Sequence, residues 1–226
     1  MIVGIHQPNY LPWGGYFYKI LMSDVFVFLD DAQYTKNSLI NRNRIKTSSG
    51  VAWLTVPVNA SISNRINEVE FSGQLWKNKH MKTIEMNYKK APYYQMYSDG
   101  LYSIISSETN KLAEMNMKII CYICSLLGAT CKFLLSSDMN LKTLSDDRLI
   151  EIVKTVKGTT YLSGRGGQNY QSEEKFVNNR INLQYTEYKQ TEYPQRWGDY
   201  EPNLSIIDIL FNCGSETREL ILGENA

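Results

Sequence analysis

The sequence has 226 residues, of which 43% are hydrophobic and 21% are charged, so it is long enough to bury the core of a globular domain. A formal net charge of +1 gives no broad basic surface, which argues against nucleic-acid binding as the main role. No apolar run reaches the ~20 residues that a membrane-spanning helix needs, and no secretory leader precedes the four cysteines. We therefore expect a soluble cytoplasmic protein without membrane insertion and with reduced thiols.

The first thirty residues carry the clearest pattern. Two apolar runs, at residues 2–5 and 25–29, are each followed by polar side chains, and a helix is expected between them at residues 16–22. This order predicts a βαβ unit, in which the carboxyl ends of both strands lie at one edge of a sheet and form a ligand-binding edge. The polar residues expected at that edge are His6, Gln7, Asn9, Asp30 and Asp31.

Two other patterns have the chemistry of a metal site. Asp30 and Asp31 carry oxygen ligands, but successive residues of a strand point in opposite directions, so the pair does not suit one ion. Cys121 and Cys124 have CxxC spacing inside an apolar helical run, without a second pair of ligands, and we interpret them as buried core residues. We predict no metal site.

Residues 37–71 are expected to form an inserted β-hairpin region. Residues 41–46 and 52–58 predict a hairpin around the turn at residues 48–50, and residues 66–71 predict another short strand. The alternating cations Arg42, Arg44 and Lys46 would project from one face of an extended segment. That face suits a phosphate or carboxylate, or else it is a solvated edge strand.

Helices and strands alternate in the rest of the chain. Helices are expected at residues 76–88, 101–106, 111–127 and from 145, and strands at residues 131–137, 159–163 and 181–188. Ser205 is expected to cap a final helix that ends at Cys213. His80 lies on a helix face with Trp76 and Ile84, so it is either a packed residue or a catalyst. These elements predict an α/β fold with a mainly parallel sheet flanked by helices, in one domain over residues 1–226.

A glycine-rich segment, Ser163 to Gly167, directly follows the strand at residues 159–163 and precedes a helix that starts near Ser172. Strand, glycine-rich loop and helix start is the order in which backbone N–H groups bind phosphate, and Arg165 would add a positive charge. A tight turn without a ligand is the alternative, because the spacing matches neither common nucleotide-binding motif.

His6, directly after the first strand, suits general-base catalysis. It would accept a proton from an amine that attacks an activated acyl donor, with Asp30 or Asp31 orienting the base or the amine. A histidine loop followed by a late glycine-rich loop is also similar to the order in adenylate-forming nucleotidyltransferases, although Tyr16 stands in place of their second histidine. In that case ATP would activate a carboxylate as an acyl-adenylate.

Four segments resemble the WbqC-like protein family: HQPNYLPWGGYFYKI, FLDDAQYTKNSLINRNRIKTSSGVAWLTVPV, YLSGRGGQNY and PNLSIIDILFNCG. Members of this family occur in bacterial clusters for O-antigen and related surface glycans, and one has been suggested to be a glycine transferase. The resemblance implies transfer of an aminoacyl or other acyl group to the amino group of a nucleotide-linked sugar. Its motifs fall on His6, Gln7, Tyr10, Trp13, Gly15, Tyr16, Asp30, Gln33, Asn41, Arg42, Asn43, Ile45, His80, Ser163, Gly164, Gly166, Gly167 and Ser205.

The expected function is therefore an amide-forming N-acyltransferase, and the alternative is a non-catalytic sugar-nucleotide-binding or scaffold protein of glycan assembly. The candidate catalytic residues are His6, Asp30 and His80. The candidate substrate-binding residues are Gln7, Asn9, Tyr10, Trp13, Tyr16, Asp31, Gln33, Asn41, Arg42, Asn43 and Arg44. The candidate phosphate-binding residues are Ser163, Gly164, Arg165, Gly166 and Gly167. The acyl donor stays open between a coenzyme A or carrier-protein thioester, an aminoacyl-tRNA, and a free acid with ATP and magnesium; a homodimer is compatible with the sequence.

Overall fold

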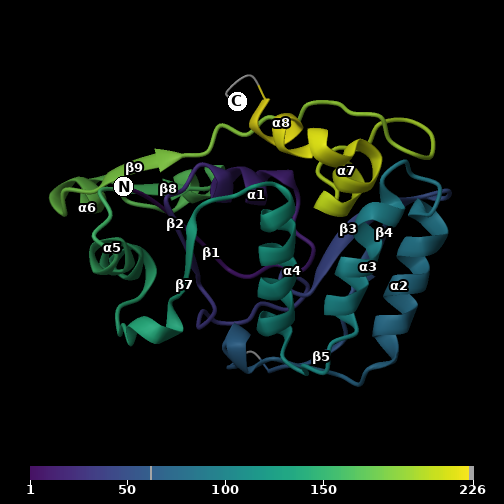
Figure 1. The fold of residues 1–226 in the computed structure, drawn as a ribbon. Helices are drawn as coiled ribbons and strands as arrows, with labels where there is room; N and C mark the ends of the chain where they lie inside the picture. Colours follow the sequence, from purple (N-terminus) through teal and green to yellow (C-terminus); the bar gives the residue numbers. More distant parts are fainter. Residues whose placement is uncertain (62, 224–226) are drawn as a thin grey trace.

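The computed structural model describes residues 1–61 and 63–223. Its largest β-sheet is parallel and lies on the left side of the view in Figure 1. The strands of this sheet are β1 (Ile2–His6), β2 (Val25–Phe28), β7 (Lys132–Leu135), β8 (Thr160–Ser163) and β9 (Asn182–Tyr185). Their order across the sheet is β7-β2-β1-β8-β9, and each neighbouring pair is parallel. The expected α/β fold with a parallel sheet is confirmed.

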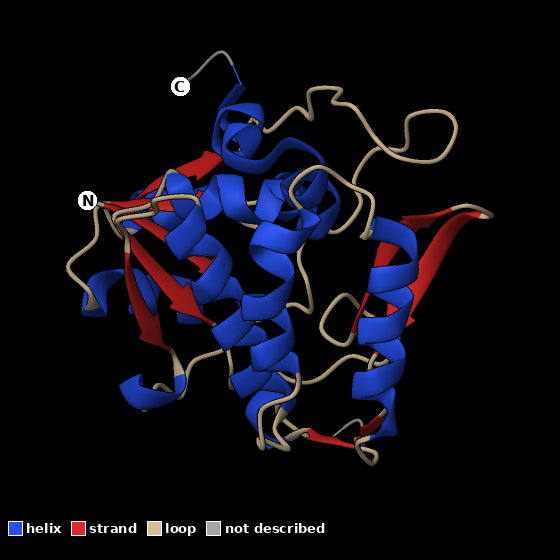
Figure 2. Ribbon diagram, turned by 45° about the vertical axis from the view of Figure 1, so that its right-hand side comes forward, coloured by secondary structure: helices blue, strands red, loops and turns tan. Residues whose placement is uncertain are grey.

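Helices cover both faces of the sheet (Figures 1 and 2). The helices are α1 (Gly14–Leu21), α2 (Leu75–Tyr88), α3 (Tyr94–Ile105), α4 (Leu112–Leu126), α5 (Ser145–Thr155), α6 (Glu173–Asn178), α7 (Ile206–Cys213) and α8 (Thr217–Leu222). Helices α5 and α6 pack on one face, where Val3 and Ile5 of β1 join a cluster with Val153 and Phe176. Phe26 of β2 points to the opposite face, towards α1 and α4. Burial on both faces explains why β1 and β2 are continuous apolar runs.

The hairpin region lies apart from the parallel sheet, beside α2 (Figure 2). Strands β3 (Arg42–Thr47) and β4 (Gly50–Thr55) pair in antiparallel fashion, which confirms the expected hairpin. Short strands β5 (Val58–Asn59) and β6 (Glu70–Phe71) form a second antiparallel pair. The strand expected at residues 66–71 is wrong in its first half, because Ile66–Glu68 form a 3-10 turn in which the Glu68 carboxylate accepts the Arg65 N–H.

Two further expectations differ from the structure. Helix α3 begins at Tyr94, earlier than the expected residue 101, because Tyr94, Tyr97 and Leu101 form one buried face. Ser205 is the N-cap residue of α7, as expected, but its side chain makes no capping hydrogen bond. Of the helices in residues 1–61 and 63–223, none is both long enough and apolar enough to cross a membrane.

A buried carboxylate joins the hairpin region to the helices. Asp208 of α7 is fully buried and accepts hydrogen bonds from the Tyr88 hydroxyl at 2.6 Å and the Tyr193 hydroxyl at 2.9 Å. The Tyr88 hydroxyl in turn accepts the Lys46 N–H of β3 at 3.0 Å. Burial raises the pKa of Asp208, while the two tyrosine hydroxyls act against that shift.

We expect Asp208→Ala to lower the free energy of unfolding by about 2–4 kcal/mol, because it leaves two buried hydroxyl groups without an acceptor. Tyr193→Phe removes only one of these hydrogen bonds and should cost about 1 kcal/mol. Urea unfolding of both variants measures the difference. A loss below about 0.5 kcal/mol for Asp208→Ala would show that the network does not hold the region together.

Candidate functional site

A cavity of about 510 Å³ opens at the carboxyl ends of the parallel strands. From β1 the chain moves outward to β2 and β7, then returns to the other side of β1 to form β8 and β9. The strand order therefore reverses between β1 and β8, which is the position where open α/β sheets bind ligands. The lining comprises Ile5, His6, Gln7, Lys19, Leu29, Asp31, Ala32, Gln33, Leu144, Ser145, Asp146, Arg148, Leu149, Tyr161, Ser163, Gly164, Gly166, Gly167 and Tyr170.

Strands β1 and β8 separate at the cavity. The pairing of β1 with β2 continues to His6, whereas the last residue of β1 that pairs with β8 is Gly4. The carbonyls of β1 alternate between its two neighbours: the His6 carbonyl accepts the Leu29 N–H after β2, so the Ile5 carbonyl faces β8. Lys19 of α1 donates to this carbonyl at 3.0 Å. An ammonium group thus occupies the gap where the sheet divides.

Lys19 is only 4% exposed, although lysine side chains are ordinarily charged and exposed to solvent. The methylene groups of its side chain pass close to the Cα of Gly4. A Cβ added at Gly4 would come within 3.4 Å of the Lys19 Cγ and 2.5 Å of the Ser23 hydroxyl oxygen. Burial lowers the pKa of Lys19 to about 7, so the amine titrates near neutral pH. Within the part of the chain that the structure describes, no carboxylate forms an ion pair with Lys19.

His6 lies at the end of β1 with its ring against the edge of Tyr16, at a centroid distance of 4.8 Å. Its Nδ1 lies 3.1 Å from the Gln7 carbonyl, so Nδ1 carries the proton and Nε2 keeps its lone pair. Burial, followed by the nearby Lys19 ammonium, lowers the pKa of His6 to about 3. Tyr16 supports the same loop, because its hydroxyl donates to the Gln7 carbonyl at 3.0 Å.

The glycine-rich segment forms the opposite wall. It folds into a 3-10 turn at Arg165–Asn169, in which the Gly167 N–H donates to the Gly164 carbonyl. Gly167 is buried, and an added Cβ would come within 2.4 Å of the Ser163 hydroxyl oxygen. Arg165, a predicted phosphate ligand, lies outside the cavity: its Nε donates to the Thr186 carbonyl, and it lines a depression on another part of the surface.

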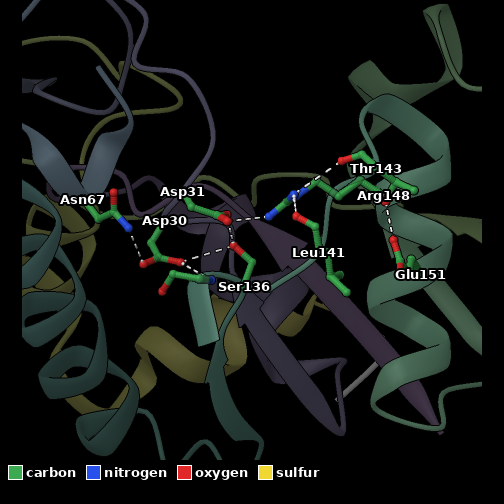
Figure 3. A network of polar contacts seen from close by, with 9 residues as sticks. Asp30, Asp31, Asn67, Ser136, Leu141, Thr143, Arg148 and Glu151 are labelled. Carbon is green, nitrogen blue, oxygen red and sulfur yellow. Dashed lines mark hydrogen bonds and ion pairs between the residues drawn. The ribbon is translucent and has the colours of Figure 1, made fainter. Parts of the chain in front are cut away.

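A polar network fixes the ends of β2 and β7 beside the cavity (Figure 3). Arg148 of α5 pairs with Asp31 at 2.5 Å and also donates to the carbonyls of Leu141 and Thr143. The Ser136 hydroxyl lies 2.5 Å from an Asp31 oxygen and 3.2 Å from an Asp30 oxygen, so the two carboxylates share one proton donor. Asp30 is buried and faces this network rather than the cavity lining.

The structure brings only part of the predicted site together. Two predicted residues contact the groups around the cavity without lining it: Tyr16 donates to the Gln7 carbonyl, and Asp30 accepts a hydrogen bond from Ser136. The predicted residues that line the cavity are His6, Gln7, Asp31, Gln33, Ser163, Gly164, Gly166 and Gly167. Asn9, Tyr10, Trp13, Asn41, Arg42, Asn43, Arg44, Arg165 and His80 lie outside its lining.

Most of the outlying residues hold the hairpin region in place. Asn43 donates to the Leu11 carbonyl, and Asn41 donates to the Val56 carbonyl. Arg42 packs over the ring of Trp53, and Arg44 donates to the Asn203 carbonyl. The alternating cations of β3 therefore make contacts within the chain.

His80 is packed inside the protein. Its Nδ1 lies 2.9 Å from the Tyr10 hydroxyl, and its ring contacts the edge of Trp76. Burial lowers the pKa of His80 to about 4. The geometry matches the alternative that the sequence left open, a packed histidine on a helix face.

Sequence reasoning missed several cavity residues: Lys19, Asp146, Arg148, Tyr161 and Tyr170. Lys19 had a detectable signal, since it is the one charged residue of the apolar helix α1. For Asp146, which is buried and accepts the Ser172 N–H at 2.9 Å, the sequence suggested only a helix start. Among residues 1–61 and 63–223, no three His, Cys, Asp or Glu side chains cluster as metal ligands would.

The fold is that of an α/β protein with a cavity where the strand order of its parallel sheet reverses. Comparison with known proteins gives a match between residues 7–220 and the WbqC-like protein family. A protein of Mycobacterium tuberculosis (strain ATCC 25618 / H37Rv), named Uncharacterized protein Rv1507c, is 36% identical over 223 residues, covering 97% of this chain and 96% of that protein. No solved structure gives a significant match. The chain belongs to the WbqC-like protein family, as its four sequence segments predict.

We expect the stability difference between Lys19→Met and the wild-type protein to depend on pH. The folded-state pKa of Lys19, about 7, lies below its usual value of 10.5, so burial of the ammonium destabilises the wild type fully below pH 7 and progressively less above it. The advantage of the variant should therefore shrink by about 2 kcal/mol from about pH 7 to about pH 9. Urea unfolding across this range measures the trend, and a constant difference would show that Lys19 stays charged in the folded protein.

Proposed function

We propose that the protein is an N-acyltransferase that forms an amide on the amino group of a nucleotide-linked sugar, in O-antigen or other surface-glycan synthesis. The observation that carries this proposal is His6, whose Nδ1 is held by the Gln7 carbonyl while its ring lines a cavity at the switch point of the sheet. A volume of about 510 Å³ suits a ligand the size of a nucleotide sugar. Family membership supports the substrate class.

In the proposed reaction the amine nitrogen attacks the carbonyl carbon of an activated acyl donor, and a C–N bond forms. The bond from that carbon to the leaving group, a thiolate or AMP, then breaks. His6 Nε2 accepts the proton that the nitrogen loses and passes it to the leaving group or to water. A pKa of about 3 makes His6 a weak base in the free cavity, and the negative charge of a bound substrate would raise that pKa.

The test is mass spectrometry of nucleotide-linked amino sugars incubated with the protein and a donor. One set of reactions contains a panel of acyl-coenzyme A thioesters, and the other contains glycine, ATP and magnesium. A gain in sugar mass supports acyl transfer, and release of AMP in the second set identifies an acyl-adenylate route. Tight binding of a sugar nucleotide without a mass change under any donor would favour the non-catalytic alternative.

We expect His6→Asn to lower turnover by about 10²–10⁴-fold, because asparagine has no basic nitrogen that could accept the proton as Nε2 does. The asparagine amide can still donate to the Gln7 carbonyl, so the local structure should be kept. His80→Gln is the matched control: it removes the other histidine, which lies outside the cavity, and should retain turnover per folded molecule. Circular dichroism of both variants reports the folded fraction. Full turnover in His6→Asn, or its loss only in His80→Gln, would contradict the role of His6.

A further inference from the structure

We propose that Lys19 and the turn at residues 163–167 form a subsite for a doubly charged tetrahedral anion, which in the substrate is a phosphoryl group. The identification of that anion as phosphoryl rests on the proposed function, whereas the anion site itself rests on the geometry of the cavity. The sequence had suggested Arg165 for this role, but the structure places Arg165 on another part of the surface.

The first support is the unused hydrogen-bonding capacity of Lys19. An ammonium group has three N–H donors, and among residues 1–61 and 63–223 the Lys19 ammonium has a single hydrogen-bond acceptor, the Ile5 carbonyl. A buried charge without a counter-charge destabilises the folded protein. A neutral hydrogen-bond donor would satisfy the Ile5 carbonyl with a smaller loss of folding free energy. A negatively charged ligand in the cavity would supply the missing counter-charge.

The second support is that, within the described residues, neither carboxylate of the cavity lining forms an ion pair with Lys19. The titratable groups that line the cavity with Lys19 are His6, Asp31, Asp146, Arg148, Tyr161 and Tyr170. Asp31 pairs with Arg148 and accepts a hydrogen bond from Ser136. Asp146 accepts the Ser172 N–H through Oδ2, while its Oδ1 is buried without a hydrogen-bond partner among the described residues. On α1 itself Lys19 is the one charged residue, and the Ser23 hydroxyl donates to the Lys19 carbonyl.

The third support is the shape of the opposite wall. Gly164 and Gly166 line the cavity, and an added Cβ at either position would meet no atom within 4 Å. Neither residue has the positive φ that demands glycine. Side chains are therefore absent where the chain itself has room for them, which leaves the backbone open to close approach by a ligand. Backbone N–H groups in glycine-rich turns commonly bind phosphate in this manner.

Anion binding at this position would be coupled to protonation. A negative charge beside Lys19 and His6 favours the protonated form of both groups, so their pKa values should rise when the anion binds. Above pH 7, where the free amine of Lys19 is largely neutral, binding should take up protons from solution. The same shift would turn His6 into a stronger base once substrate is present.

Sulfate is a suitable probe, because it is a tetrahedral dianion that does not itself titrate near neutral pH. We would measure its binding by isothermal titration calorimetry at about pH 8, one unit above the pKa of about 7, in buffers of different ionisation enthalpy that report proton uptake. We expect sulfate binding with proton uptake that falls at lower pH, and an upward shift of the His6 pKa in NMR titrations. Acetate, tested in parallel, should bind more weakly than sulfate.

Lys19→Met should raise the Kd for sulfate about tenfold or more and abolish proton uptake. Lys77→Met is the matched control, because Lys77 is also buried with a lowered pKa but lies outside the cavity, where it donates to the carbonyls of Ser107 and Thr109. Its sulfate binding should equal that of the wild type.

The proposal is overturned if the wild-type protein does not bind sulfate, if Lys19→Met binds sulfate as the wild type does, or if Lys77→Met loses binding equally. In the second case Lys19 would serve only to satisfy the Ile5 carbonyl. Preferred binding of acetate would indicate a carboxylate site. None of these results requires acyl transfer, so failure of the anion site and failure of the proposed reaction can be told apart.

Discussion

The parallel pairing of β1 with both β2 and β8 is the constraint on which the rest of the structure depends. Parallel neighbours require crossover connections, so helices must cover both faces and all carboxyl ends of the strands must meet at one edge. Because the chain leaves β1 towards β2 and later returns on the side of β8, the two halves of the sheet separate at that edge. The cavity, and every group that lines it, follows from this reversal.

The distribution of charge in the cavity depends on the same separation of β1 from β8. The Ile5 carbonyl loses its partner strand, and Lys19 replaces that partner. Burial, and then the nearby Lys19 ammonium, lower the pKa of His6 and keep its ring neutral. By contrast, Arg148 and Asp31 neutralise each other at the neighbouring strand end. The two halves of the cavity therefore differ: one contains an ion pair, and the other contains Lys19, which pairs with no carboxylate among the described residues.

The sequence predicted the elements better than the site. Apolar runs followed by polar residues located β1, β2 and β8, and thus His6, Gln7, Asp31 and the glycine-rich turn, because strand ends in a parallel sheet share an edge. The directions of individual side chains could not be predicted from the sequence. Nothing local indicates that Arg165 turns away from the cavity, or that Arg42 and Arg44 contact groups within the chain. Lys19 was missed because a lysine on an apolar helix is ordinarily assigned to the solvent-facing side. Its hydrogen bond to the Ile5 carbonyl, in the gap between β1 and β8, could not be read from the sequence.

The pairing of β1 with β8 also affects how the protein is made. Residues 2–4 find their partners at residues 160–162, so during synthesis on the ribosome β1 leaves the exit tunnel long before β8. Until then, the nascent chain presents a half-built sheet with one unpaired, apolar edge, which is prone to aggregation and is a typical target of chaperones. Chains truncated before β8 should thus be degraded or aggregate in the cell rather than accumulate as folded fragments.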